Sequence, residues 1–131
     1  MWLFTKHGFY SVIADAEVPE NVIIRARDKG DLERLKALFR KFYPGSTLAT
    51  APIYDSLYSD YRYRVFCPKG DFEAATALLA RDVDYGNLKT EIGKAGDGGR
   101  DMAYMSVWSA MRHWQQNKVT YKVNKKWTSQ T

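Results

Sequence analysis

Two hydrophobic periods alternate along the first two thirds of the chain. Residues 22–27 and 61–67 alternate with period two and are rich in β-branched and aromatic side chains, which predicts β-strands. Each run leads into a nearly identical five-residue segment, KGDLE at 29–33 and KGDFE at 69–73. Beyond each segment, apolar residues recur at helical spacing, which predicts an amphipathic helix. The same strand-to-helix pattern therefore occurs twice.

An earlier strand is predicted in each half, over residues 2–14 with a bend or bulge at Gly8, and over residues 47–53. The repeated unit is then ββα, at about residues 1–43 and 44–83. This order predicts an α+β fold with a duplicated ββα core. Its four-stranded antiparallel sheet would be that of a ferredoxin-like fold whose last strand is moved to the front. The two arginine-bearing runs then become neighbouring central strands.

The KGD segments have two interpretations. Asp31 and Asp71, or the residues just before them, can cap the exposed amides at the start of each helix. Alternatively, Lys29 or Lys69 assists bare helix amides in binding an anion. We favour the cap, because the two aspartates already supply negative charge at the helix starts.

The rest of the chain predicts helices. Residues 85–93 predict a short helix, 93–99 a flexible glycine-rich loop, and 100–116 a long helix. We expect a single domain over residues 1–116, and a basic tail at 117–131 that either adds an edge strand or is disordered. One side of the long helix carries a stripe that is typical of core packing: Tyr104, Val107, Trp108, Met111 and either Trp114 or Gln115.

Composition indicates an ordinary soluble protein. Hydrophobic residues make up 45% of the chain and charged residues 27%, and no apolar run approaches the roughly 18–20 residues that span a bilayer. The N-terminus lacks the pattern of a signal peptide. Cys67 is the single cysteine and has no partner for an internal disulfide, so we expect a cytoplasmic protein without a membrane partner.

The basic pI of about 9.3 comes from one end of the chain. Residues 112–131 contain five basic residues and no acid, whereas residues 1–111 hold 15 basic and 15 acidic residues. Because the folded body is neutral overall, any argument for an anionic partner depends on where its charges lie rather than on their sum.

The predicted sheet places arginines on one face. If Val22, Ile24 and Ala26 face the helices, Arg25 and Arg27 point to the other side. The same argument for the second run sends Arg62, Arg64 and Phe66 outward. Such a surface can hold phosphates and stack bases, which predicts a non-catalytic module that binds RNA or DNA. The predicted nucleic-acid-binding residues are Arg25, Arg27, Tyr61, Arg62, Arg64, Phe66, Lys118, Lys122, Lys125 and Lys126. Further stacking is expected from Tyr10, Tyr54 and Tyr58.

Three alternatives are open. The C-terminal helices can cover this face and pair its arginines with acids such as Asp82, Asp84, Asp97 or Asp101. The chain can instead be a protein-interaction module, an inhibitor or adaptor, with Trp114 and Trp127 as anchors. The facing itself is also in question. The forty-residue spacing of the KGD segments aligns Ile24 with Arg64, so either the second strand carries a bulge or one facing is wrong.

Catalytic signals are sparse. His7 and His113 belong to no metal-ligand spacing, so we expect no metal and no cofactor. Cys67 has no base near it in sequence and is expected to be a buried small hydrophobe. The acid pairs at 82/84 and 97/101 border helix ends or loops, where acids are common. A small enzyme acting on a phosphorylated ligand is therefore the third function, behind the two binding functions.

Several stretches are similar to a family of small, uncharacterised bacterial proteins. The similar stretches are MWLFT with GFYSV, RARDKGDLERL, DYRYR, DYGNLK and AYMSVW, which together extend across roughly residues 1–111. The resemblance implies a compact bacterial domain, with the basic tail outside it. It implies no activity, ligand or catalytic residue.

Overall fold

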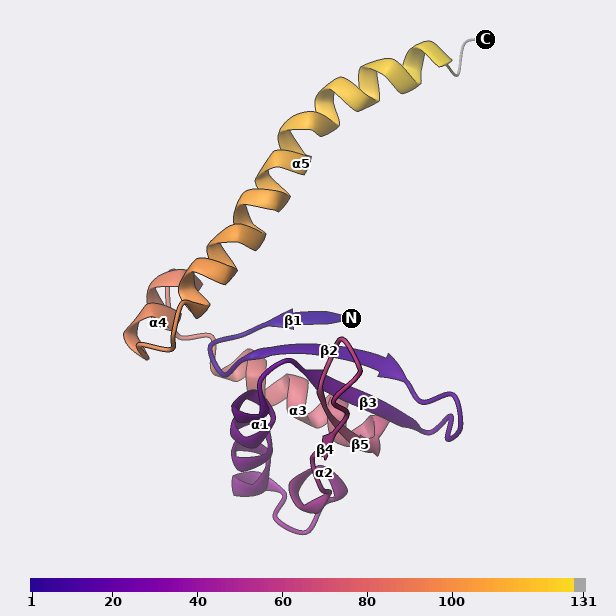
Figure 1. Cartoon of the computed structure of the whole chain (residues 1–131), viewed down its shortest axis with the longest axis vertical. Coiled ribbons are helices and arrows are strands. Elements are labelled where there is room, and N and C mark those ends of the chain that lie inside the picture. Colours follow the sequence, from indigo (N-terminus) through magenta and orange to yellow (C-terminus); the bar gives the residue numbers. More distant parts are fainter. Residues whose placement is uncertain (129–131) are drawn as a thin grey trace. The chain divides into compact units, whose positions relative to one another are not determined.

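The structure is a computed structural model of the whole chain that describes the backbone of residues 1–128 and the side chains of residues 1–118. The chain forms two compact units, Met1–Gly86 and Asn87–Thr131, where the sequence predicted one domain over residues 1–116 (Figure 1). Each unit is described by itself below.

The first unit is an open antiparallel sheet of five strands with three helices. Its strands are β1 (Trp2–Phe4), β2 (Phe9–Ala14), β3 (Asn21–Ala26), β4 (Tyr54–Asp55) and β5 (Tyr63–Pro68). Its helices are α1 (Lys29–Phe42), α2 (Thr47–Thr50) and α3 (Lys69–Arg81). The strand order is β1-β2-β3-β5-β4, so β3 and β5 are the neighbouring central strands that the sequence predicted. The α+β class is confirmed, but the sheet has five strands and not four.

The fifth strand arises because the predicted strand over residues 2–14 is a hairpin. Thr5 closes its turn: the Thr5 amide and hydroxyl both donate to the Gly8 carbonyl, at 3.0 and 2.9 Å, and the Thr5 Oγ1 accepts from the amides of His7 and Gly8. The chain thus reverses at residues 5–8 instead of bending, and β1 pairs antiparallel with β2.

The predicted strand over residues 47–53 is wrong, because its first part is helix α2. Ser46 caps this turn by accepting from the Ala49 amide at 3.3 Å, and Asp71 accepts from the Leu48 amide at 3.0 Å. Side chains of α1 then hold the far end: Lys36 donates to the carbonyls of Leu48 and Ala51. These caps outweigh the strand propensity of the threonines, and only the two-residue strand β4 remains.

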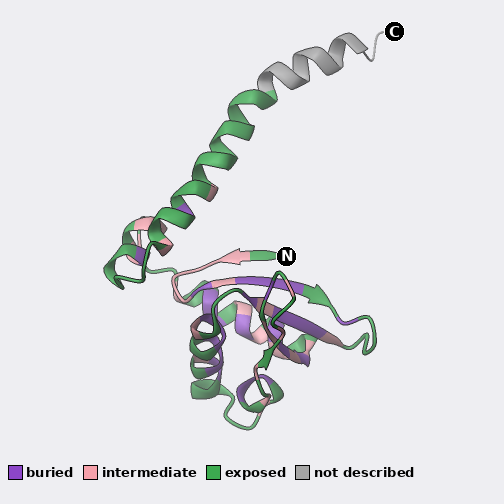
Figure 2. Ribbon diagram, viewed as in Figure 1, coloured by how far each residue is buried: buried purple, intermediate pink, exposed green. Residues whose placement is uncertain are grey.

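One face of the sheet carries the core, and the facing predicted from the sequence is confirmed. The core residues of the strands are Tyr10, Val12, Val22, Ile24, Ala26, Val65 and Cys67, and they pack with apolar residues of α1, α2 and α3 (Figure 2). Cross-strand pairing places Ile24 opposite Val65 on this face and Arg25 opposite Arg64 on the other.

The conflict of register is resolved where each strand joins its helix. Arg27 and Asp28 separate the last inward-facing residue of β3, Ala26, from α1. Only Pro68 separates Cys67, the last inward-facing residue of β5, from α3. The difference of one residue reverses the alternation between the two halves, so both facings hold without a bulge.

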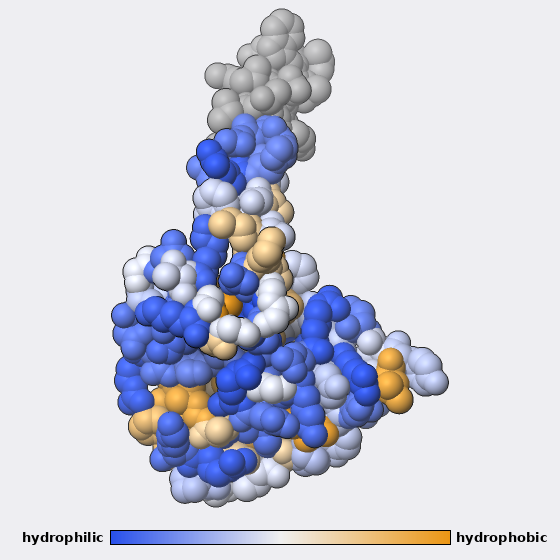
Figure 3. Space-filling view, turned by 60° about the vertical axis from the view of Figure 1, so that its left-hand side comes forward, coloured by the Kyte–Doolittle hydropathy of each residue, from blue (hydrophilic) through white to orange (hydrophobic). Residues whose placement is uncertain are grey.

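The second unit contains α4 (Leu88–Lys94) and α5 (Arg100–Thr128). Ile92 of α4 and Tyr104 of α5 are its buried side chains among the described residues. The edge strand or disorder predicted for 117–131 is not found as far as Thr128, because α5 continues through that segment. Core packing of the stripe on α5 is also wrong beyond Tyr104, because Trp108, Met111 and Trp114 are about half exposed (Figure 3).

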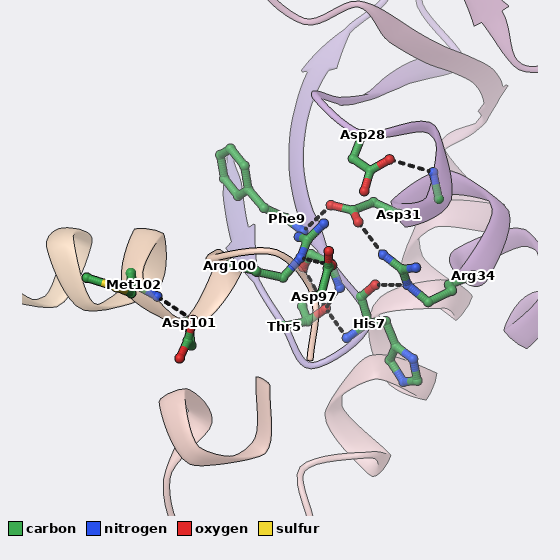
Figure 4. A network of polar contacts seen from close by, with 12 residues as sticks. Thr5, His7, Phe9, Asp28, Asp31, Arg34, Asp97, Arg100, Asp101 and Met102 are labelled. Atoms are coloured by element: carbon green, nitrogen blue, oxygen red, sulfur yellow. Dashed lines mark hydrogen bonds and ion pairs between the residues drawn. The ribbon is translucent and has the colours of Figure 1, made fainter. Parts of the chain in front are cut away.

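The two KGD aspartates make equivalent contacts, which explains the repeated segment. Asp31 accepts a hydrogen bond from the Phe9 amide of β2 at 2.9 Å, and Asp71 accepts the one from the Leu48 amide of α2. Each aspartate therefore ties the start of its helix to the backbone of an earlier element of its own half, β2 in the first and α2 in the second. The cap of α1 is instead Asp28, which accepts from the Gly30 amide at 3.1 Å (Figure 4).

Candidate functional site

A single row of side chains crosses the outer face of the sheet through all five strands. The pairing registers place Trp2 opposite Ser11, Ser11 opposite Arg25, Arg25 opposite Arg64, and Arg64 opposite Tyr54. We call these five residues the cross-strand row. Its two end members are aromatic and well exposed, at 67% for Trp2 and 53% for Tyr54, and its centre consists of two arginines.

The two central arginines lack acidic partners. Among residues 1–118, no carboxylate forms an ion pair with Arg25 or Arg64, although both side chains are half-buried. Arg25 donates to the Ser11 hydroxyl at 2.7 Å, and Arg64 makes only a long contact of 3.5 Å to the Tyr61 carbonyl. The Nε atoms of both arginines are buried without a hydrogen-bond partner. Like charges in direct register repel, so the row concentrates uncompensated positive charge.

Tyr61 organises this charge. The loop between β4 and β5 brings its ring beneath two guanidinium groups, 4.5 Å from Arg25 and 4.3 Å from Arg27. Arg27 also donates to the Asp60 carbonyl at 2.9 Å. Because Tyr61 is only 5% exposed, it positions the arginines and does not offer a free ring for stacking, unlike the role expected from the sequence.

Arg62 lies apart from this cluster, at the edge of the sheet. It forms a two-point ion pair with Asp55, at 2.7 and 3.0 Å, and lies 5.3 Å from the ring centre of Tyr63. The hydrogen bond from Arg62 lowers the pKa of the Asp55 carboxyl. Both members are exposed and neutralise each other. Of the four predicted arginines, Arg25, Arg27 and Arg64 are therefore brought together and Arg62 is not.

The predicted aromatic residues have different environments. Phe66 lies on the outer face, half-buried, edge-on to Tyr54 with their ring centres 5.6 Å apart. Tyr58 is fully exposed in the loop before β5. Tyr10, by contrast, is completely buried in the core, where its hydroxyl donates to the Asp31 carbonyl at 2.7 Å. It is unavailable to a ligand.

The predicted lysines belong to α5. Lys118 is exposed and lies 5.0 Å from the ring centre of Trp114. The side chains of Lys122, Lys125 and Lys126, like that of Trp127, lie outside the described residues.

The acids that the sequence offered as partners for the arginines bind other groups. Asp82 contacts His7 at 2.8 Å and Asp84 contacts Lys6 at 3.1 Å. In the second unit, Asp97 pairs with Arg100 at 2.7 Å. None of these contacts reaches the cross-strand row.

The His7–Asp82 pair is the strongest feature for catalysis. It borders a cleft of about 220 Å³ between the β1–β2 turn and the end of α3. A histidine oriented by a carboxylate can act as a base if a nucleophile lies beside it. The one hydroxyl that α3 contributes, Thr76, donates instead to the Glu73 carbonyl at 2.7 Å. The cleft therefore lacks an assembled nucleophile among its described side chains.

Cys67 is fully buried in the core as expected. Burial, with a smaller contribution from the Asp71 charge, raises the pKa of its thiol to about 12. A thiol with this pKa is unreactive at neutral pH. No group of three potential metal ligands lies together among the described residues.

Two members of the cross-strand row were missed in the sequence, Trp2 and Ser11. They were missed because residues 2–14 were treated as one strand. In the structure these residues form a hairpin, which places Trp2 of β1 opposite Ser11 of β2. The residues of its turn, Thr5 and Gly8, were the available clue, because a threonine hydroxyl and a glycine three residues apart favour a chain reversal.

Comparisons with protein-family models, with curated proteins and with solved structures gave no match to this chain. The described part of the chain contains no helix with the length and apolarity needed to cross a membrane.

Proposed function

We propose that the chain is a non-catalytic module that binds single-stranded nucleic acid on the cross-strand row. Arg25 and Arg64, supported by Arg27, contact the phosphates. Trp2 and Tyr54, at the two ends of the row, stack on bases, and Phe66 extends the surface beside Tyr54. The lysines of α5 contribute non-specific attraction.

The observation that carries this proposal is the pair Arg25–Arg64. Two guanidinium groups opposite each other on adjacent strands, without an acid among the described side chains, are destabilising unless an anion lies between them. Cation–π contacts with Tyr61 hold Arg25 and Arg27 in place before any ligand arrives, which reduces the entropy lost on binding. The planar fork of donors on a guanidinium matches the oxygens of a phosphate, which makes arginine a common residue in nucleic-acid recognition.

The shape of the row favours a polymer over a small anion. Neighbouring strands lie about 4.8 Å apart, so a row across five strands is about 19 Å wide and matches a few nucleotides of an extended strand. Aromatic rings at the ends of the row add stacking worth about 1–3 kcal/mol per base. A duplex hides the faces of its bases, so the proposal favours single strands.

We also propose that β2, β3, α1, β4, β5 and α3 form the permuted ferredoxin-like core, with β1 as an added edge strand. The order β2-β3-β5-β4, antiparallel throughout, supports it. Within the first unit, the three helices pack on the core face of the sheet, and the two ends of the cross-strand row, Trp2 and Tyr54, are exposed to such a ligand.

Fluorescence anisotropy with labelled single-stranded RNA, single-stranded DNA and duplex DNA tests the function. We expect Arg25→Gln and Arg64→Gln each to weaken single-strand binding about tenfold or more, because each removes a charge-assisted hydrogen bond to phosphate. Each should also reduce the slope of log K against log salt by about 0.7 for every phosphate that is no longer neutralised.

Arg62→Gln is the matched control, because it removes the same charge from the same strand region at a residue already paired with Asp55. It should change affinity less than threefold or so, in keeping with a screened surface pair. Equal losses for Arg62 and Arg64 would mean diffuse attraction and no site on the row. Absence of binding to all three ligands near physiological salt would refute the function altogether.

A further inference from the structure

Several large apolar side chains are exposed along one side of α5 in the second unit. Val107 and Trp108 are adjacent, and Met111, Trp114 and Lys118 follow on the same side at intervals of three or four residues, as along the seam of a coiled coil. We call these five residues the α5 stripe. Trp108 is 48% exposed, Met111 57% and Trp114 58%. Figure 2 shows that most of the described part of α5 is coloured as exposed. Exposed aromatic residues in such a series mark an interaction surface.

Cations surround the rings of this stripe. Lys89 of α4 lies 4.6 Å from the centre of the Trp108 ring, Arg112 lies 5.4 Å from the same ring, and Lys118 lies 5.0 Å from the ring of Trp114. Between Met102 and Lys118, α5 contains no acid. The surface therefore combines tryptophan, methionine and arginine, the residue types enriched at protein interfaces, with a positive rim.

We propose that the α5 stripe docks an acidic amphipathic helix of a protein partner. The apolar seam of that helix packs on Trp108, Met111 and Trp114, and its flanking glutamates face Lys89, Arg112 and Lys118. From Val107 to Lys118 the stripe is about 17 Å long, which is three helical turns and enough for a short helix-in-groove contact. This inference is independent of nucleic-acid binding by the sheet.

Charge argues against a second copy of the chain as the occupant. When two copies of α5 pack antiparallel about Met111, Trp108 of one helix meets Trp114 of the other. Arg112 then lies within one turn of the Arg112 of the other copy, and neither helix has an acid between Met102 and Lys118 to pair with these two cations. Parallel packing aligns each cation with itself. Like charges across a packed seam oppose both arrangements.

The other side of α5 argues against a lipid surface. Helices that lie in a membrane interface carry basic residues on the side facing water. The side of α5 opposite the stripe instead carries uncharged residues: Met102, Met105, Ser106, Ser109, His113 and Gln116. The cations lie around the apolar stripe, where an acidic protein helix would meet them.

The test uses the full chain and two synthetic three-heptad peptides of equal charge. The first has leucine at its a and d positions and glutamate at e and g. The second keeps every glutamate but has serine at a and d. Near physiological salt, we expect the leucine peptide to bind at least about tenfold more tightly by calorimetry and to shift the tryptophan emission to the blue.

Variants locate the site. Trp108→Ala and Met111→Ser should each weaken the leucine peptide about tenfold or more, because each removes an anchor from the middle of the stripe. Ser109→Ala, on the opposite side of the same helix, should leave binding unchanged. Circular dichroism of each variant checks that helix content is kept. The double variant Arg25→Gln, Arg64→Gln should also bind the leucine peptide normally, which separates this inference from the function of the sheet.

Three outcomes would overturn the proposal. Equal binding of the leucine and serine peptides would reduce the surface to general electrostatic attraction. A concentration-dependent dimer in sedimentation that is abolished by Trp108→Ala would make a second copy the occupant. Stronger binding to anionic vesicles than to the leucine peptide, abolished by Trp108→Ala, would make it a lipid surface.

Discussion

The two ββα halves use the same KGD aspartate but surround it differently. In the first half, Asp31 has a side chain only 3% exposed, and it binds the Phe9 amide and the Arg34 guanidinium. In the second half, Asp71 is half-buried and accepts one backbone amide, that of Leu48. The repeat therefore supplies one structural contact twice, and the surrounding residues decide how much each contact stabilises.

The difference between the halves also shapes the candidate site. The first half forms a full hairpin whose outer strand supplies Trp2, whereas the second half replaces most of its first strand by α2 and retains only Tyr54 and Asp55 as strand β4. The one-residue difference at the strand-to-helix junctions places Arg25 opposite Arg64. In a perfect duplication, Arg64 would take the inward-facing position that corresponds to Ile24. The pairing of Arg25 with Arg64 on the outer face therefore depends on the one-residue difference between the halves.

The largest difference in stability between equivalent variants of the two halves is expected for glycine-to-alanine substitutions near the two aspartates. A β-carbon at Gly8 would lie 2.5 Å from the Asp31 Cγ, and that side chain is too buried to move away. Gly8→Ala should destabilise the protein by about 3 kcal/mol. Gly70→Ala, in the first turn of α3 with no atom within 4 Å of the new β-carbon, should be neutral or stabilising by up to about 1 kcal/mol.

Urea unfolding followed by circular dichroism measures both glycine variants. A loss of stability at Gly70 similar to that at Gly8 would mean that the surroundings of Gly70 are as crowded as those of Gly8, contrary to the structure.

The aspartates themselves give the next largest contrast. Asp31→Asn keeps one acceptor but turns a donor toward either the Phe9 amide or Arg34, and it removes the charge, so we expect a loss of about 2–3 kcal/mol. Asp71→Asn retains an oxygen for the Leu48 amide and should cost less than about 1 kcal/mol. Thermal unfolding at neutral pH compares the pair; the reverse ranking would contradict the burial difference.

The N-terminal caps of α1 and α3 are expected to differ less in their contribution to stability. Asp28→Ala removes the side chain that accepts from the Gly30 amide at the start of α1 and should cost about 1 kcal/mol. The equivalent residue, Pro68, makes no side-chain cap on α3. Pro68→Asp should gain a cap of about 1 kcal/mol but lose a similar stabilisation from the rigid proline, leaving stability within about 0.5 kcal/mol of the parent. Denaturant midpoints measure both; a large loss in Pro68→Asp would show that the proline ring has another role.

The elements that depend on local sequence pattern were predicted correctly. Period-two alternation was sufficient for β3 and β5, their central position and their facing, because each strand has one buried side. Helical spacing was sufficient for α1 and α3. The prediction failed where side chains distant in the sequence decide the structure. Asp71 and Ser46 turn residues 47–50 into a helix, and the first of these lies beyond the reach of local propensity.

The candidate site was predicted in part for the same reason. Arg25, Arg27 and Arg64 follow from alternation, and the structure does bring them together around Tyr61. The ion pair that withdraws Arg62 needed the position of β4, which the sequence misplaced. On α5, the amphipathic spacing identified the residues of the stripe but did not predict that they are exposed. The same periodic pattern is found on a helix that packs in the core and on one that offers a docking surface.

The last contrast concerns the inward-facing residue that ends each central strand, Ala26 in β3 and Cys67 in β5, both completely buried. Burial raises the Cys67 pKa to about 12, above its value of about 8.5 in an unfolded chain. The folded state therefore keeps the thiol proton longer, so its stabilising effect is complete below pH 8 or so and is lost as pH rises toward 12. Between pH 8 and pH 9 the parent should lose stability relative to Cys67→Ala, by less than about 1 kcal/mol. Urea unfolding of both proteins across this range measures the difference; parallel stability curves would mean that the buried thiol ionises as readily in the folded protein as in the unfolded chain.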